Sequence, residues 1–281
     1  MTKSNFYGII VLKMKENIIN QKGKSNGQIN SYSTNKKCCH PKAEKFIVLD
    51  VEGYSTARPY NIGYIVADKY GTIYLKRSIA LPACIWENIV SMIASRQAEE
   101  MTKANIEEIL QDEEKKRTKR KYQKMSIQQF KKLFETDIAN FNVKRLFAYN
   151  VNFDKAALKR LFGDIEFLKL NLEYCDIISG IVQSKLLSKK YIDFCNTNSF
   201  ITEKGNVMTK AEIVYKYLTN ALDFVEEHTG LADCEIEYQI LLTVFNTHKK
   251  VNWKPCQAWK ILKNFCNEKE IDIKIPENGA L

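Results

Sequence analysis

The sequence lacks any long hydrophobic run. No apolar stretch in its 281 residues approaches the roughly 20 residues that a membrane-spanning helix needs. The apolar run from Phe6 to Leu12 is short and is closed by Lys13, so we expect no secretory signal. Hydrophobic residues still make up 45% of the chain, which is enough for the core of one domain of about 200 residues with appendages.

The sequence also lacks the paired cysteine spacing of a disulfide scaffold. Its eight cysteines are scattered and form no C-x-x-C pair. This usage is typical of reduced thiols, so we expect an intracellular, cytoplasmic protein. Cys38, Cys39 and His40 invite a zinc interpretation, but adjacent cysteines chelate poorly and no second pair is evident. A plain flexible tail is the favoured interpretation of these three residues.

Most of the chain lacks a net positive charge, although the net charge of the whole sequence is +10. Residues 1–45 contribute +7 and residues 113–124 contribute +5, which leaves −2 for all the others. Residues 1–43 are rich in Asn, Lys and Ser and predict a basic, flexible N-terminal arm. Such an arm either holds phosphates electrostatically or is a passive extension.

The second basic segment lies in an expected helical insertion at about residues 86–141. Residues 86–101, 104–124 and 127–141 have helical patterns, and the sequence from Ser126 to Gln129 has the form of a capping box. The basic run from Lys115 to Lys121 could follow a nucleic-acid backbone or form a solvated helix face. We slightly favour phosphate contact.

Two carboxylates stand two residues apart at the end of a predicted strand. The apolar run that begins at Phe46 predicts a buried strand that continues through Val51. Because side chains alternate along a strand, Asp50 and Glu52 project from the same face. Like charges this close repel each other unless a cation neutralises them, and carboxylate oxygens suit Mg²⁺ or Mn²⁺. Taken alone, the pattern also fits two solvated residues.

Another acidic residue follows a second predicted strand, which begins at Arg145. After this strand come Asn150 and Asp154, and then a helical pattern that Gly163 is expected to end. Asp154 could be the N-cap of that helix, but this interpretation leaves Asn150 without a role.

A histidine and a further aspartate precede a late helix. His228 lies in a loop that contains Gly230, and Asp233 lies near the start of a helix that we expect to reach about His248. Because His228 is in a loop, it can converge with Asp233. The alternatives are an ordinary loop histidine and an N-cap aspartate.

In this order the motifs resemble the DEDDh exonuclease superfamily, which includes proofreading exonucleases, RNase T and oligoribonuclease. The resemblance covers about residues 44–248. A sister group has a tyrosine four residues before the last aspartate; here that position is Thr229, which indicates the histidine branch. The family's general-base histidine matches His228, and its four acidic positions match Asp50, Glu52, Asp154 and Asp233.

The resemblance implies an α/β fold with an RNase H-like mixed sheet flanked by helices. The exonuclease domain is expected at residues 44–250, followed by a C-terminal extension at 251–281. Residues 61–67 and 72–79 predict a hairpin antiparallel to the first strand, and strands at Arg145 and at 173–176 would add the parallel half. The sequence from Thr209 to Glu212 predicts a capping box and a helix through Leu218.

The implied activity is metal-dependent 3′→5′ exonuclease action on single-stranded DNA. Asp50 would bridge two ions, Mg²⁺ or Mn²⁺, and the coordination shells would be completed by Glu52, Asp154 and Asp233. His228 would take the proton from the attacking water. The DNA preference rests on the basic arm and the large insertion. The alternatives are an exoribonuclease of the same fold and a non-catalytic nucleic-acid-binding module. Proofreading would need a separate polymerase partner, for which the sequence gives no sign.

Three further residues are candidates for binding the terminal nucleotide. Many members of the superfamily carry a Thr-Thr-Gly turn after the first two acids, whereas this chain has Gly53 and Tyr54. Gly53 could allow close backbone approach, and Tyr54 could stack on a base or be an ordinary strand-end aromatic. Asn150 could orient either the nucleotide or Asp154.

Overall fold

The computed structural model describes residues 42–53, 59–81, 122–226 and 228–275. Nearly all of the N-terminal arm, including Cys38, Cys39 and His40, lies outside these residues. Tyr54 and the basic run from Lys115 to Lys121 lie outside them as well. No helix in the described ranges combines the length and apolar character needed to cross a membrane.

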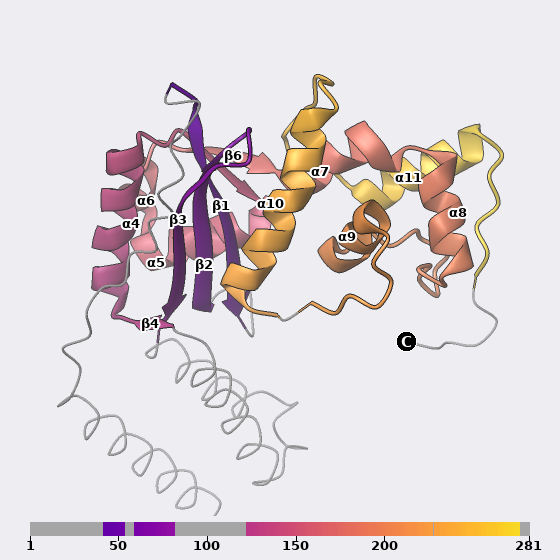
Figure 1. Cartoon of the computed structure of the whole chain (residues 1–281). Coiled ribbons are helices and arrows are strands. Elements are labelled where there is room, and N and C mark those ends of the chain that lie inside the picture. The colour runs from indigo at the N-terminus through magenta and orange to yellow at the C-terminus, as the bar shows by residue number, and fades with distance from the viewer. Residues whose placement is uncertain (1–41, 54–58, 82–121, 227, 276–281) are drawn as a thin grey trace, which may run out of the picture. The chain divides into compact units, whose positions relative to one another are not determined.

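A six-stranded mixed sheet forms the centre of the described chain, with strand order β4-β3-β2-β1-β5-β6 (Figure 1). Strands β1 and β2 and strands β2 and β3 pair antiparallel, while β5 pairs in parallel with both β1 and β6. The predicted hairpin and the predicted parallel half are both confirmed. The strands are β1 (Lys45–Gly53), β2 (Pro59–Asp68), β3 (Ile73–Ala80), β4 (Gln123–Lys124), β5 (Arg145–Ala148) and β6 (Glu173–Asp176).

Strand β1 is central and is buried on both faces. Phe46 and Val48 belong to one hydrophobic cluster, while Ile47 and Leu49 belong to the other. A strand covered on both sides needs a continuous apolar run, which explains the pattern that predicted it. By the same alternation, Asp50 points toward the face that holds Phe46 and Val48.

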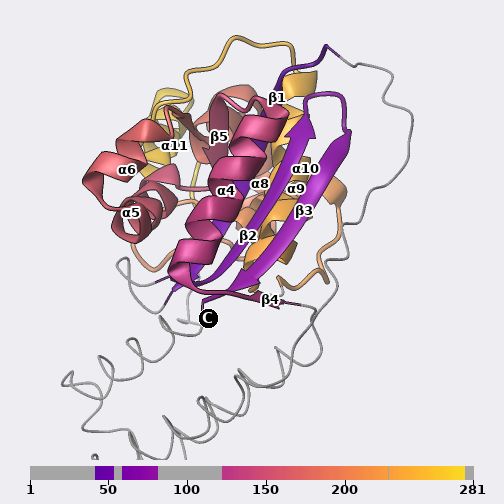
Figure 2. The ribbon, with the colours of Figure 1, turned by 90° about the vertical axis from the view of Figure 1, so that its left-hand side faces the viewer.

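Helices cover both faces of this sheet (Figures 1 and 2). On one side, the core includes α4 (Ile127–Phe141), α5 (Val151–Phe162) and α6 (Asp164–Lys169). On the other side, α10 (Gly230–Asn246) packs directly on β1 and β2. Behind α10 the second core is completed by α7 (Ile177–Ile181), the π-helix η2 (Val182–Leu186), α8 (Lys189–Thr197), α9 (Ala211–Thr219) and α11 (Ala258–Glu268).

The chain after α10 packs into the second core. Ala258, Leu262 and Cys266 of α11 are buried there. The Trp253 carbonyl accepts a hydrogen bond from the Asp176 N–H (2.8 Å), and its ring packs edge-on against Phe147. Residues 251–275 therefore share the core of the sheet-bearing region.

The capping boxes had different outcomes. At the start of α4, Ser126 Oγ accepts from the Gln129 N–H (3.2 Å), and Gln129 Oε1 accepts from the Ser126 N–H (2.8 Å), as predicted. The box at Thr209 is wrong, because α9 begins after Lys210 and has no side-chain cap. Glu212 is one turn from Lys216 and forms an ion pair with it instead (2.8 Å).

One predicted helix ends differently. Residues 123 and 124 were expected to close a helix that begins at 104, but they form the short strand β4. They pair in parallel with Ile79 and Ala80 at the edge of β3. An open sheet edge offers unpaired backbone groups, and these outweigh the local helical pattern.

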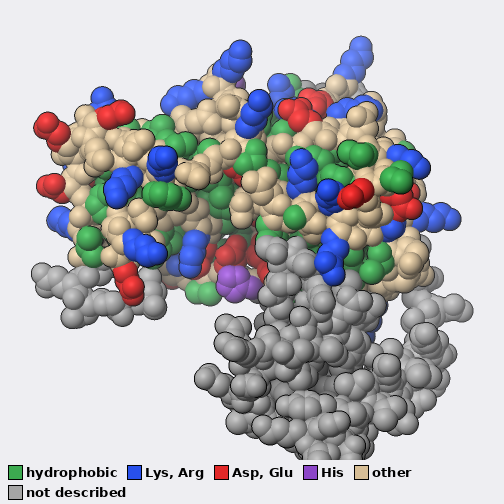
Figure 3. Space-filling model, turned by 180° about the vertical axis from the view of Figure 1, so that it is seen from behind, with side chains coloured by type: hydrophobic (Ala, Val, Ile, Leu, Met, Phe, Trp, Pro, Cys, Tyr) green, Lys and Arg blue, Asp and Glu red, His purple; other side chains and the backbone are tan. Residues whose placement is uncertain are grey.

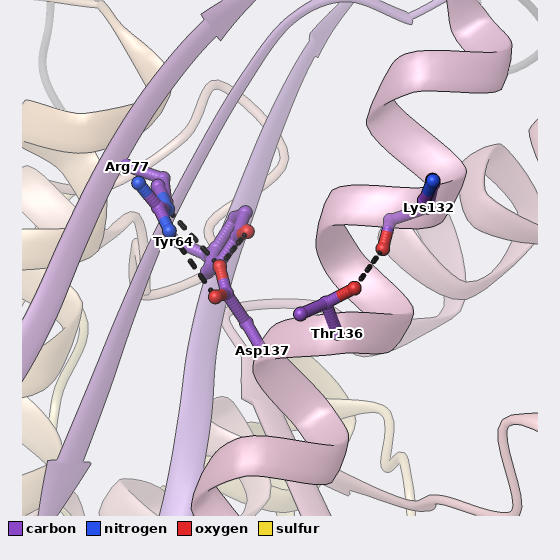
Figure 4. Close-up of polar contacts among 5 residues, drawn as sticks. All are labelled: Tyr64, Arg77, Lys132, Thr136 and Asp137. Carbon is purple, nitrogen blue, oxygen red and sulfur yellow. Dashed lines mark hydrogen bonds and ion pairs between the residues drawn. The ribbon is translucent and has the colours of Figure 1, made fainter. Parts of the chain in front are cut away.

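A largely buried ion pair that the sequence did not indicate fixes α4 to the sheet (Figure 4). Asp137 of α4 accepts hydrogen bonds from Tyr64 Oη (2.7 Å) of β2 and from Arg77 Nε and Nη2 (3.0 and 3.1 Å) of β3. Burial and the Asp137 charge raise the pKa of Tyr64 well above its usual value. The site is therefore a structural anchor between α4 and two strands.

Candidate metal centre

The first two acids lie where β1 leaves the core. In the pairing of β1 with β2, Asp50 is opposite Gly63 and Glu52 is opposite Asn61, and the register shifts between Glu52 and Gly53. Asp50 and Glu52 are both partly buried. Their common face is the one that α10 covers, so their side chains point toward the start of that helix.

Helix α10 reaches Asp50 because two glycines allow it to touch the sheet. A Cβ on Gly63 would collide with the backbone of Gly230, and a Cβ on Gly230 would collide with Gly63 in turn. The Gly230 N–H also donates to Asn61 Oδ1 (2.9 Å). This contact was missed from the sequence, although a glycine inside an apolar strand is a signal of close backbone approach.

Asp154 lies in the first turn of α5, which begins at Val151. The N-cap interpretation of Asp154 is wrong, because Asn150 takes the cap position with a left-handed backbone (φ 68°). That turn carries Asp154 into the protein, where only 2% of it is exposed. The Asn150 side chain is exposed, and its proposed role toward a nucleotide stays a prediction.

Asp233 is also one turn inside its helix rather than at the cap. The N-cap of α10 is Thr229, whose carbonyl accepts from the Asp233 N–H (2.9 Å). The N-cap interpretation of Asp233 is therefore wrong, and the residue is only 5% exposed. His228 precedes this cap in a left-handed conformation (φ 49°), and its side chain is 70% exposed.

The fold brings three of the five predicted residues within ligand distance of one another, while Asp50 and Asp154 lie outside that group but close enough for their charges to affect each other's surroundings. Glu52, His228 and Asp233 each offer a ligand atom, and these atoms lie within 4.8 Å of one another. Figure 3 shows histidine and acidic side chains gathered at one place on the surface of the described chain. We call Asp50, Glu52, Asp154 and Asp233 the candidate metal centre.

Three oxygens of this centre are buried without a hydrogen-bond partner among the described residues. They are Asp50 Oδ2, Asp154 Oδ1 and Asp233 Oδ1. A buried carboxylate oxygen without a partner costs free energy, and removing an ionised group from water costs still more. A bound divalent cation would supply the positive partner that such oxygens lack, and hard oxygen donors suit Mg²⁺ or Mn²⁺. The donor set therefore fits such an ion.

The pKa values of these carboxyls reflect the same crowding. Burial and the charges of Asp154 and Glu52 raise the pKa of Asp50 well above its usual value. Burial likewise raises the pKa of Asp154, and burial together with Asp50 raises the pKa of Asp233 to about 9. Without a cation, these groups reduce their repulsion by holding protons.

Two further acids beside the centre were missed from the sequence. Glu237 is 3% exposed and lies one helical turn after Asp233, a spacing that could have drawn attention to it. Glu226 lies 3.8 Å from His228, measured from Oε2 to Nδ1, and burial raises its pKa. Burial and the charges of Asp50 and Asp154 also raise the pKa of Glu237 well above its usual value. Both residues therefore add to the crowding of carboxyl groups around the four predicted acids.

Of the residues predicted to contact a nucleotide after β1, Gly53 is among the described residues and Tyr54 is not. Gly53 is the last residue of β1 and is partly buried, directly after the register shift. Tyr54 lies outside the described residues.

No protein-family model matches the chain, and no curated protein matches it either. The structure and the residue chemistry therefore carry the functional argument.

Proposed function

We propose that this chain is a divalent-metal-dependent 3′→5′ exonuclease of the DEDDh type, with an RNase H-like fold, that cleaves single-stranded DNA. The observation that carries the proposal is that Asp50, Asp154 and Asp233, from β1, α5 and α10, each have a buried oxygen that lacks a partner, and that Asp50 lies near enough to the other two for their charges to interact. The mixed sheet, with its antiparallel hairpin and parallel half, is compatible with that fold.

The residues have separable chemical roles. Asp50, Glu52, Asp154 and Asp233 would hold the ions, which when bound neutralise phosphate charge and help to generate a nucleophile at neutral pH. His228 stands beside Glu52 and Asp233 with most of its side chain in solvent. It can therefore accept a proton from an attacking water and pass that proton to bulk solvent. Glu226 lies near its ring and can help to orient it.

Two alternatives differ from this proposal in a measurable way. An exoribonuclease would use the same centre, and the choice of DNA rests on the basic arm and the large insertion. A binding module without catalysis would not need four convergent acids and a histidine. Such a module would bind oligonucleotides but would release no nucleotides when metal is added.

The test is digestion of 5′-labelled DNA and RNA oligomers with Mg²⁺, with Mn²⁺ or with chelator. We expect a descending ladder on single-stranded DNA, resistance when the 3′ end is blocked, and no cleavage in chelator. An Asp154→Asn variant is the control for a contaminating nuclease. Full activity in excess chelator, or cleavage of circular single strands, would contradict the proposal; preferential digestion of RNA would select the exoribonuclease.

A further inference from the structure

Glu237 is a buried carboxylate that the proposed chemistry does not use. It lies on α10 one turn after Asp233 and is almost wholly enclosed. Its Oε2 accepts a hydrogen bond from the backbone N–H of Tyr149 (3.2 Å). Unlike Asp50, Asp154 and Asp233, Glu237 has no buried side-chain oxygen that lacks a hydrogen-bond partner in the described part of the chain.

The backbone N–H of Tyr149, which donates to Glu237, lies at the turn that leads to Asp154. Strand β5 ends at Ala148, Asn150 takes the left-handed conformation, and α5 starts at Val151. A backbone in that conformation is unfavourable for most side chains and persists where its surroundings hold it. The placement of Asp154 thus depends on contacts made by the junction at residues 149–151.

Two buried carboxylates accept hydrogen bonds from the backbone of this junction. Asp176, at the end of β6, accepts from the N–H groups of Asn150 (3.1 Å) and Val151 (3.2 Å). Asp176 is itself fixed by the N–H and hydroxyl of Ser179 (3.0 and 2.6 Å). Glu237 takes the preceding N–H, that of Tyr149. Among these contacts, the one from Glu237 connects the junction to α10.

Helix α10 therefore carries one acid of the metal centre and, through Glu237, helps to place another. Asp233 and Glu237 are four residues apart and share a face of the helix. A shift of α10 would move Asp233 directly and would also break the contact with Tyr149. The same carboxylate thus links two elements that approach Asp50 from different directions.

We propose that Glu237 is a positioning residue whose hydrogen bond to the Tyr149 N–H keeps Asp154 in register with Asp50 and Asp233 for cation binding. The proposal rests on the metal centre described under Proposed function. Groups that orient metal ligands without touching the ion typically change metal affinity by about 10- to 100-fold when they are removed. Glu237 acts through the backbone, so any side chain that supplies the acceptor should be sufficient.

The test compares Glu237→Gln with Glu237→Leu in the full chain. Gln keeps an oxygen acceptor for the Tyr149 N–H but loses the charge, whereas Leu loses both. We expect Mn²⁺ affinity, measured by titration calorimetry, to stay within about threefold of wild type for Gln and to fall by about 10- to 100-fold for Leu. Excess Mn²⁺ should restore turnover of the Leu variant. Glu235→Gln, on the same helix and paired with Lys76, is the matched control and should change neither quantity.

Three outcomes would overturn this role. Wild-type Mn²⁺ affinity in the Leu variant would show that Glu237 only fills space in the core. An equal loss of Mn²⁺ affinity in the Gln and Leu variants would show that its charge, rather than its hydrogen bond to Tyr149, supports cation binding. Should the Leu variant not fold, rapid exchange of the Tyr149 amide hydrogen in wild type would also contradict the proposal. Wild-type protein that binds Mn²⁺ but cleaves neither DNA nor RNA would instead refute the nuclease activity, and the affinities would still decide the role of Glu237.

Discussion

Asp50 and His228 both lie near Glu52 but differ in their contact with water. Oδ2 of Asp50 is buried without a partner, whereas the His228 side chain is mostly in solvent. A buried, unpartnered carboxylate oxygen such as that of Asp50 suits a cation, whereas a solvent-exposed imidazole such as that of His228 can pass protons to water. Substitutions of the two residues should therefore have different effects on Mn²⁺ binding and on turnover.

Asp50→Asn should abolish both Mn²⁺ binding and nuclease activity, because it removes the charge of a central ligand. His228→Ala should leave the four acids in place and lower turnover by about 10²- to 10⁴-fold, the usual contribution of a positioned general base. Partial recovery of the His228 variant at high pH would show hydroxide replacing the base. A large loss of Mn²⁺ affinity in His228→Ala would make the imidazole a ligand instead, as its proximity to Glu52 and Asp233 would permit.

The raised pKa values predict how the metal-free protein responds to pH. Asp233 has a pKa of about 9 in the folded chain, against an ordinary value of 3.8. Between these values the folded state keeps a proton that the unfolded state releases, so the free energy of unfolding falls as pH rises. The melting temperature in chelator should drop from pH 5 to pH 8, and this slope should be shallower in Asp233→Asn.

Divalent metal should reverse that trend. A cation must displace the protons on the centre, so Mn²⁺ affinity should increase over the same pH range. Calorimetry in buffers of different ionisation enthalpy would count the protons released. An affinity independent of pH would contradict the raised pKa values of Asp50 and Asp233.

At the scale of elements, local patterns predicted most strands and helices but not their contacts. The apolar run of β1 is long enough to show a strand buried on both faces, and Gly163 ends α5 with a positive φ of 79° as its residue type suggests. The predictions for residues 123–124 and for the start of α9 were wrong. Strand β4 forms on the open edge of β3, a contact distant in sequence, whereas Glu212 pairs with Lys216 one turn later instead of capping its helix.

The crossing of α10 over β2 gives a prediction for Gly63. In Gly63→Ala the new Cβ must push α10 away from the sheet, since it meets backbone rather than a flexible side chain. We expect a loss of about 1–3 kcal/mol or more in stability and a clear drop in Mn²⁺ affinity, because Asp233 moves with the helix. Gly71→Ala is the control: its Cβ would meet nothing, but its φ of 91° costs stability by about 1–2 kcal/mol. Normal Mn²⁺ affinity in Gly63→Ala would show that the close approach does not set the centre.

The anchor of α4 should affect stability alone. Asp137→Ala leaves the partly buried Arg77 guanidinium and the Tyr64 hydroxyl without their shared partner, which should cost about 1–3 kcal/mol. Chemical denaturation would measure that loss. Mn²⁺ affinity should remain normal, because α4 lies on the face of the sheet opposite α10 (Figure 2). A parallel loss of metal affinity would mean that the two faces of the sheet are coupled.

For the whole molecule, residue type and order identified the four acids and the histidine, but their convergence is a tertiary property. Asp50 and Glu52 could be placed together from strand alternation alone. Asp176 and Glu237 could not be found in this way, because each acts on backbone N–H groups distant in sequence, 25 residues or more in the hydrogen bonds that they make to the junction. Charge, by contrast, can be assigned to segments directly from the sequence.

The segregation of positive charge predicts how the chain should hold a single strand. Residues 1–45 carry +7 while the chain outside its two basic segments sums to −2, so deleting residues 1–43 should weaken binding and flatten its salt dependence. Each lost lysine–phosphate contact should reduce the slope of log K against log salt by about 0.7, while turnover on short saturating oligomers stays nearly intact.

Two double variants that remove the same number of lysines test whether the position of the charge or its total matters. Lys36→Ser with Lys37→Ser should flatten the slope, whereas Lys260→Ser with Lys263→Ser, on the exposed side of α11, should not. A salt slope that is unchanged from wild type in the deletion and in both double variants would show that the N-terminal segment is a passive extension.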